Sequence, residues 1–200
     1  MTASSSKKSQ PIPDYLIYEM DEGKPIYYRG YKAVLKGEKN PEEIIGSSIL
    51  QSTLIELIKD YLKIQLGKKY FILASELGLL FKKKSWRSVD IAIYPKKTLQ
   101  RLELVDEYLS IPPKIVLEVD TKAHFENASD ADYYFQHKTD QLLDFGVERV
   151  IWIYTRTEKF MIAEKDKRWE MANWKEDLDI MDRIVVNIPK LVEQFYQIEE

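Results

Sequence analysis

The sequence has no cysteine and only two histidines among its 200 residues. The absence of cysteine excludes disulfide bonds, thiolate metal sites and cysteine nucleophiles. With so few histidines, a histidine-rich zinc site is not expected either. A metal ion bound to this protein would therefore be held mainly by oxygen ligands, which favours Mg²⁺ or Mn²⁺.

Long apolar runs are also missing, and glycine is sparse. No segment approaches the length of a membrane span, and the start of the chain, MTASSSKKSQ, lacks the apolar stretch of a signal peptide. We therefore expect a cytoplasmic protein that does not associate with membranes. The seven glycines are scattered, so the sequence contains neither a glycine-rich phosphate loop nor a Gly-x-Ser-x-Gly elbow.

The charge is nearly balanced, with a net charge of −3 and both signs interspersed, so no global field marks a nucleic-acid-binding protein. A local basic cluster nevertheless occurs in one stretch of the chain. Its members are Lys82, Lys83, Lys84, Arg87, Lys96, Lys97 and Arg101. Lys82, Lys84 and Arg87 are our candidates for contacting nucleic acid, and a solvated hairpin and loop is the alternative interpretation.

A chain of 200 residues with 44% apolar residues suits one domain. We expect a disordered tail over residues 1–12 and a single domain over residues 13–200. Turn residues and hydrophobic periodicity predict the elements within it. Helices are expected from Ser47 or Ser48 to Gln65, over 131–145 and from Asn187 to Ile198; strands are expected over 70–75, 79–82, 88–94, 114–120, 147–154, 160–164 and 169–174.

The order of these elements predicts a mixed α/β fold. The stretch 114–154 forms a strand–helix–strand unit with parallel strands. The expected architecture is a central mixed sheet flanked by helices, with a small β extension near the C-terminus.

Glu118 is the most informative residue, because it lies in the run 114–120, which otherwise predicts a buried strand. An isolated buried carboxylate costs several kcal/mol, or takes up a proton, unless a cation or hydrogen-bond donors compensate. Side chains alternate along a strand, so Glu118 and Asp120 are expected on one face. Two carboxylates so placed repel each other, and the pair therefore predicts a cation between them.

Two further residues join this pattern. Asp90 is a lone acid in the apolar strand 88–94. Lys138 lies in the middle of an apolar arc of the helix 131–145, where it either extends its ammonium to water or reaches the acids of the preceding strand. Structural alternatives also exist for the acids, because Asp90 could pair with Arg87 and Asp120 could cap a turn. Together, Asp90, Glu118 and Lys138 suit metal-assisted hydrolysis of phosphodiesters.

The same pieces carry a resemblance to a known family. The matching segments are residues 88–93, 113–119 and 145–152, together with Lys138 and Leu142. In their order and spacing they resemble the Uma-two family of endonucleases, within the PD-(D/E)XK nuclease superfamily and its restriction-endonuclease-like fold. The resemblance covers most of residues 13–190.

The resemblance implies a Mg²⁺- or Mn²⁺-dependent endonuclease acting on DNA. Asp90, Glu118 and Lys138 would be catalytic, and Asp90, Glu118 and Asp120 would be the metal ligands. Val89 stands where the superfamily usually has proline, and Asp120 stands where it usually has lysine, a role that Lys138 would take over from the helix. Asp120 would then be a third metal ligand or a partner of Lys138.

Two alternative functions remain open from the sequence, and the oligomeric state is open as well. The chain could be a catalytically inactive nuclease-fold module that binds nucleic acid or a protein, with Glu118 and Lys138 as a structural pair. A glycosidase-like carboxylate pair is another interpretation, although it needs neither a third acid nor a central lysine. Many nucleases of this fold pair up to cut both strands, so a homodimer is also possible.

Overall fold

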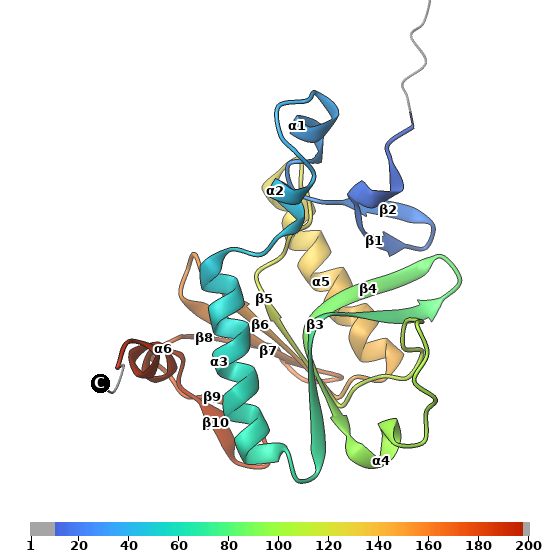
Figure 1. Ribbon diagram of the computed structural model, residues 1–200. Helices are drawn as coiled ribbons and strands as arrows, with labels where there is room; N and C mark the ends of the chain where they lie inside the picture. The colour runs from blue at the N-terminus through green and yellow to red at the C-terminus, as the bar shows by residue number, and fades with distance from the viewer. Residues whose placement is uncertain (1–10, 198–200) are drawn as a thin grey trace, which may run out of the picture.

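The computed structural model describes residues 11–197, which form a mixed α/β fold around an eight-stranded sheet (Figure 1). The strands of this sheet are β1 (Ile17–Asp21), β2 (Lys24–Tyr27), β3 (Tyr70–Lys82), β4 (Ser85–Pro95), β5 (Ile115–Val119), β6 (Arg149–Tyr154), β7 (Lys159–Glu164) and β8 (Glu170–Asn173). Their order is β2-β1-β4-β5-β6-β7-β8, and β3 pairs with β4 beside this path. The expected fold class is confirmed.

The helices and a small second sheet complete the fold. The helices are η1 (Asp14–Leu16), α1 (Tyr31–Leu35), α2 (Glu42–Ile45), α3 (Ile49–Leu66), α4 (Lys96–Leu99), α5 (Ala128–Phe145) and α6 (Ile188–Tyr196). The second sheet pairs β9 (Leu178–Met181) with β10 (Ile184–Val186). Residues 1–10 of the expected tail lie outside the described part of the chain.

The expected strand–helix–strand unit is β5–α5–β6, and its two strands are parallel. Asn127 caps α5 by accepting a hydrogen bond from the backbone N–H of Asp130, at 3.0 Å. The helix therefore begins three residues before the predicted Ala131. Gly146 ends it with a positive φ of 116°, a conformation that glycine adopts without strain.

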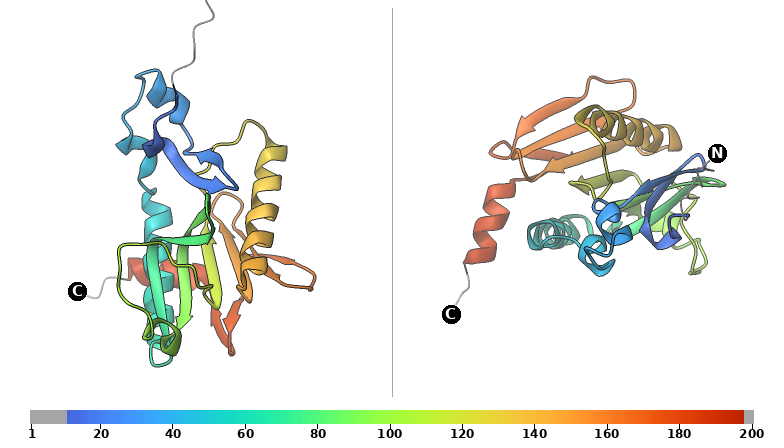
Figure 2. Two further views of the ribbon diagram at one scale, coloured as in Figure 1. Left: turned by 90° about the vertical axis from the view of Figure 1, so that its right-hand side faces the viewer. Right: turned by 90° about the horizontal axis from the view of Figure 1, so that it is seen from above.

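Helices cover the two faces of the sheet (Figure 2). Helix α3 places Leu54, Ile58 and Leu62 against the apolar face that includes Ile91 and Leu117, and α6 packs into the same core. Helix α5 packs on the opposite face, in a second core that contains many aromatic side chains. Glu118 and Lys138, two of the functional residues predicted from the sequence, meet on the face that α5 covers.

Strand β3 departs from the prediction of two short strands, because it runs without a break over 13 residues. The strand contains a β-bulge. Ala74 pairs with Ile91 and Leu77 pairs with Val89, so Ser75 and Glu76 together stand opposite Asp90. Both bulge residues have positive φ angles, 85° and 54°. Bulges of this kind bend a strand and redirect its side chains, often beside active sites.

Among residues 11–197, no helix is both long enough and apolar enough to span a membrane.

Candidate active site

The candidate site lies where β4 separates from β5. The pairing of these strands ends at Ile91 and Leu117. Beyond this point the carboxylate of Asp90 takes the place of a strand carbonyl, because its Oδ2 accepts a hydrogen bond from the backbone N–H of Val119 at 2.7 Å. At the other backbone group of the same residue, the Gln51 side chain donates to the Val119 carbonyl at 2.7 Å.

Glu118 and Lys138 meet in this gap, as the sequence analysis anticipated. Their Oε1 and Nζ atoms are 2.9 Å apart, and both side chains are almost completely buried. The ammonium also donates hydrogen bonds to Glu19 Oε1 at 2.8 Å and to the Ser88 carbonyl at 2.7 Å. Lysine has three N–H donors, so Lys138 can serve Glu19, Ser88 and Glu118 together, and Glu118 Oε1 is buried in an ion pair with it.

Glu19, which the sequence analysis did not select, is a central member of the site. It is fully buried on β1 and accepts hydrogen bonds from Lys138, Arg87 and the hydroxyl of Tyr134. Its position within the short strand Ile17–Asp21, an acid beside apolar residues, resembles that of Glu118 in β5. However, the sequence does not show that β1 lies across the gap from α5.

Arg87 was expected to contact nucleic acid, and the structure contradicts this expectation. Its side chain is only 1% exposed, and it pairs with Glu19 at 3.2 Å and with Asp21 at 3.4 Å. Gln141 of α5 also accepts hydrogen bonds from the guanidinium. The reason is the β1–β2 hairpin, which packs against this end of β4 and covers a residue that alternation alone would leave exposed.

The five buried charged residues of the described chain all belong to this cluster. They are Glu19, Arg87, Asp90, Glu118 and Lys138. Three acids face two bases, so the cluster has one more acidic group than basic groups. Buried charges without compensation are unfavourable, and the surplus acid therefore requires either a proton or an additional cation.

The pKa values of the acids in the cluster are consistent with one surplus acidic group. Burial raises the pKa of Glu118 to about 8, with a further contribution from the negative charge of Asp90, while the charge of Lys138 acts in the opposite direction. Burial also raises the pKa of Asp90, to about 6. Burial by itself lowers the pKa of Lys138, but the charges of Glu118 and Glu19 outweigh it and raise this pKa above its ordinary value.

Asp90 and Glu118, the metal ligands expected from the sequence, lie near enough for the charge of Asp90 to raise the pKa of Glu118. Both are carboxylates, the ligand type that Mg²⁺ and Mn²⁺ prefer. Within residues 11–197, no group of three or more acidic or histidine side chains is arranged as a metal site. A metal ion held by these two carboxylates alone would have to keep several waters, as Mg²⁺ commonly does.

Asp120 does not share the face of Glu118, contrary to the expectation from strand alternation. Strand β5 ends at Val119, and Asp120 turns away with a φ of 57°. Both oxygens of its carboxylate accept hydrogen bonds from Thr155, one from the backbone N–H at 2.9 Å and one from the hydroxyl. In this structure Asp120 ties the end of β5 to the end of β6, and it is not a partner of Lys138.

A cavity of about 160 Å³ opens onto Asp90. It lies between the start of α3 and the bulge of β3, and its lining includes Glu56, Ser75 and Glu76. The sequence analysis gave Glu56 no role and did not select Glu76, because the bulge that places Glu76 here leaves no clear pattern in the sequence. Lys122, which follows β5, forms an ion pair with Glu76 across the mouth of the site.

Of the remaining candidates, Lys82 is the last residue of β3 and Lys84 lies on the turn between β3 and β4. Lys84 is exposed, and Lys82 forms an ion pair with Glu22, with 62% of its side chain exposed. Their contact with nucleic acid remains a prediction.

A comparison with solved structures identifies a similar fold. The crystal structure of a "putative nuclease belonging to DUF820" from Anabaena variabilis matches this chain with a TM-score of 0.65 and 12% sequence identity. The match covers 88% of this chain and 89% of that one. At this identity the likeness shows a shared, nuclease-like fold. No protein-family model and no curated protein matches the sequence.

Proposed function

We propose that this protein is a Mg²⁺- or Mn²⁺-dependent endonuclease of the PD-(D/E)XK type, related to the Uma-two family, and that its substrate is DNA. The observation that carries the proposal is the gathering of all five buried charged residues into one cluster with a surplus acid. The nuclease-like fold of the similar crystal structure supports it.

Asp90 and Glu118 would hold the metal ion. When bound, such an ion lowers the pKa of a coordinated water and stabilises the charge that develops on a phosphoryl group. Lys138 keeps the Glu118 carboxylate in place and balances its charge, while Glu19 fixes the ammonium of Lys138 from the other side. Asp90 is also held in position, since its Oδ2 is bound by the backbone of Val119.

The test is cleavage of supercoiled plasmid DNA with Mg²⁺ or Mn²⁺, compared with EDTA. We expect the wild type to nick the plasmid, and Asp90→Asn and Glu118→Gln to lose that activity. Asp144→Asn is the matched control, because Asp144 is exposed and pairs only with Lys165 among the described residues. Cleavage that survives in Glu118→Gln, or that proceeds in EDTA, would refute the proposal.

The burial of Glu118 and Lys138 favours a second candidate, a nuclease-fold module that binds nucleic acid without cutting it. Both side chains are at most 2% exposed, and Asp90 is the member of the cluster that lines a cavity. For such a module, the wild type would bind DNA but leave the plasmid intact with either ion. Glu118→Gln would then bind DNA as tightly as the wild type.

A further inference from the structure

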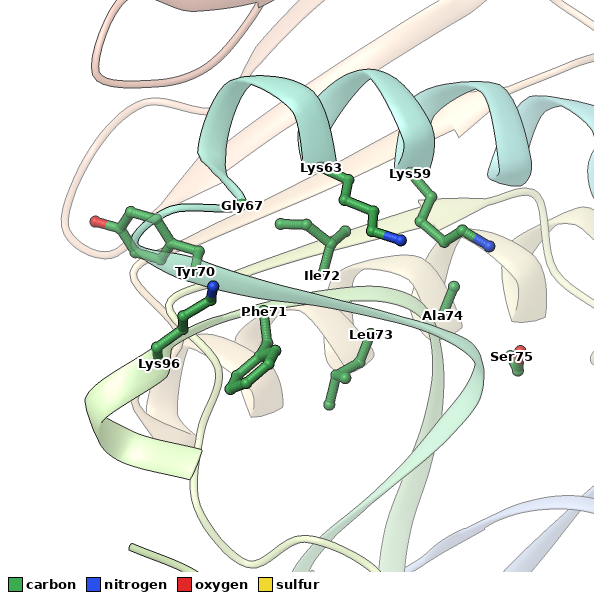
Figure 3. Close-up of a pocket in the computed structure, with 10 residues that line it drawn as sticks. All are labelled: Lys59, Lys63, Gly67, Tyr70, Phe71, Ile72, Leu73, Ala74, Ser75 and Lys96. Carbon is green, nitrogen blue, oxygen red and sulfur yellow. The ribbon is translucent and has the colours of Figure 1, made fainter. Parts of the chain in front are cut away.

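A groove lies between α3 and the edge strand β3, and the charged side chains that line it are all basic. Its volume is about 460 Å³, and its lining includes Lys59, Lys63 and Lys96 but no carboxylate. Figure 3 shows Lys59 and Lys63 extending from α3 over β3, with Lys96 near Phe71 at the other end of the groove. The groove therefore offers positive charge along its length.

Two of these lysines are available to an external anion. Within residues 11–197, Lys63 and Lys96 form no ion pair with an acidic side chain, whereas Lys59 pairs with Glu56. The Lys96 ammonium lies 5.4 Å from the centre of the Phe71 ring. Phe71 itself is 36% exposed, so its ring is accessible from the groove. An aromatic ring next to a free ammonium suits an unpaired base and its phosphate.

The groove leads to the candidate active site. Ser75 of the β3 bulge lines this groove and also the smaller cavity that opens onto Asp90. The first cavity contains three lysines and no acid, and the second contains three acids and no base. The phosphates of a nucleic-acid strand would be attracted to the lysines, and a linkage that extends to the acidic cavity would need the proposed metal ion there to offset the repulsion of the carboxylates.

We propose that the α3–β3 groove binds one unpaired strand of nucleic acid, with phosphates at Lys63 and Lys96 and a base against Phe71. This inference rests on the proposed nuclease function for the direction of the strand toward Asp90. It moves the nucleic-acid surface away from the β3–β4 turn, where the sequence analysis placed it with Lys82 and Lys84.

The experiment measures binding of a fluorescein-labelled single-stranded DNA to the full chain by anisotropy, in EDTA so that metal-dependent cleavage cannot interfere. We expect Lys63→Ala/Lys96→Ala to weaken binding about tenfold. The plot of the logarithm of the association constant against the logarithm of the salt concentration should also become less steep by about 1.4, or about 0.7 per lysine. Phe71→Ala should weaken binding at least about fivefold. The matched control is Lys165→Ala/Lys167→Ala, which removes two exposed lysines from the turn between β7 and β8 and should change neither quantity.

Three outcomes would overturn the proposal. The first is an unchanged affinity in the groove variants, and the second is an equal loss in the groove and control variants, which would indicate attraction to charge alone. The third is a wild type that binds the matching duplex but not the single strand. Thermal unfolding of each variant shows whether its fold is intact. If the groove variants lose binding while the wild type does not cleave a plasmid, the proposed nuclease function is refuted and the proposed binding groove is supported.

Discussion

Replacing Glu118 with glutamine is expected to stabilise the metal-free protein at neutral pH. Burial raises the pKa of Glu118 from 4.5 to about 8, so at pH 7 the folded protein keeps a proton that the unfolded chain releases. The interval between 4.5 and 7 is about 2.5 pH units, each worth about 1.36 kcal/mol. The raised pKa therefore lowers the free energy of unfolding of the wild type at pH 7 by at most about 3 kcal/mol, and this is the largest gain expected for Glu118→Gln. Glutamine is neutral at every pH and avoids this penalty, while its side-chain oxygen still faces Lys138.

The sign of the pH dependence follows from the same shift. Between pH 4.5 and 8 the folded wild type binds more protons than the unfolded chain at this group, so its stability falls as the pH rises through that window. Glu118→Gln lacks this fall. Asp90, whose pKa is raised from 3.8 to about 6, contributes a fall of its own that is common to both proteins and cancels in the comparison.

The assay is urea unfolding, followed by tryptophan fluorescence and circular dichroism, at several pH values from 5 to 8 in EDTA. The matched control is Glu19→Gln, which removes the anion shared by Lys138 and Arg87 and should destabilise the protein by about 3–5 kcal/mol. A Glu118→Gln variant that is less stable than the wild type at pH 7, or that shows the same pH dependence, would refute the reasoning.

Three further predictions concern the same cluster. The affinity for Mn²⁺, measured by calorimetry, should rise from about pH 6 to about pH 8. Asp90 and Glu118 have pKa values raised to about 6 and about 8 and must release protons to bind a cation. An affinity that does not change with pH would contradict the assignment of Asp90 and Glu118 as metal ligands. Lys138→Met should lose about 3–5 kcal/mol in urea unfolding, since it leaves two buried acids without their ammonium, and a loss below about 1 kcal/mol would show that the pair is not needed. Asp120→Ala should lose about 1–2 kcal/mol through its bonds to Thr155 and keep its Mn²⁺ affinity, whereas a tenfold weaker affinity would restore Asp120 as a metal ligand.

Local patterns in the sequence were sufficient to predict much of the fold. The parallel pairing of β5 and β6 followed from the strand–helix–strand order, and Gly146 marked the end of α5. The meeting of Glu118 and Lys138 was also predictable, because a strand with an acid directly preceded a helix with a lysine on its apolar face. Each of these inferences depends on residues that are near one another in the chain or on one regular element.

Other parts of the site depend on contacts between distant segments, and the sequence alone did not predict them. Glu19 reaches Lys138, 119 positions away in the chain, only because the β1–β2 hairpin packs against β4. The same packing buries Arg87, which looked like a surface residue. The bulge that turns Glu76 toward the cavity is likewise decided by the pairing of β3 with β4.

The sequence by itself determined that a buried acid, Glu118, needed compensation by a cation, donors or a proton, since an isolated carboxylate is unfavourable in an apolar strand whatever the fold. It predicted a metal ion there and offered Lys138 as a neighbour that either reaches the acids or extends to water, and the structure shows that Lys138 reaches Glu118. Only the tertiary structure decided how the charges balance, because this depends on how many acids converge on one ammonium. Glu19 and Glu118 share the one ammonium of Lys138, so the buried acids outnumber the buried bases of the described chain, and from that surplus acid the proposed metal site follows.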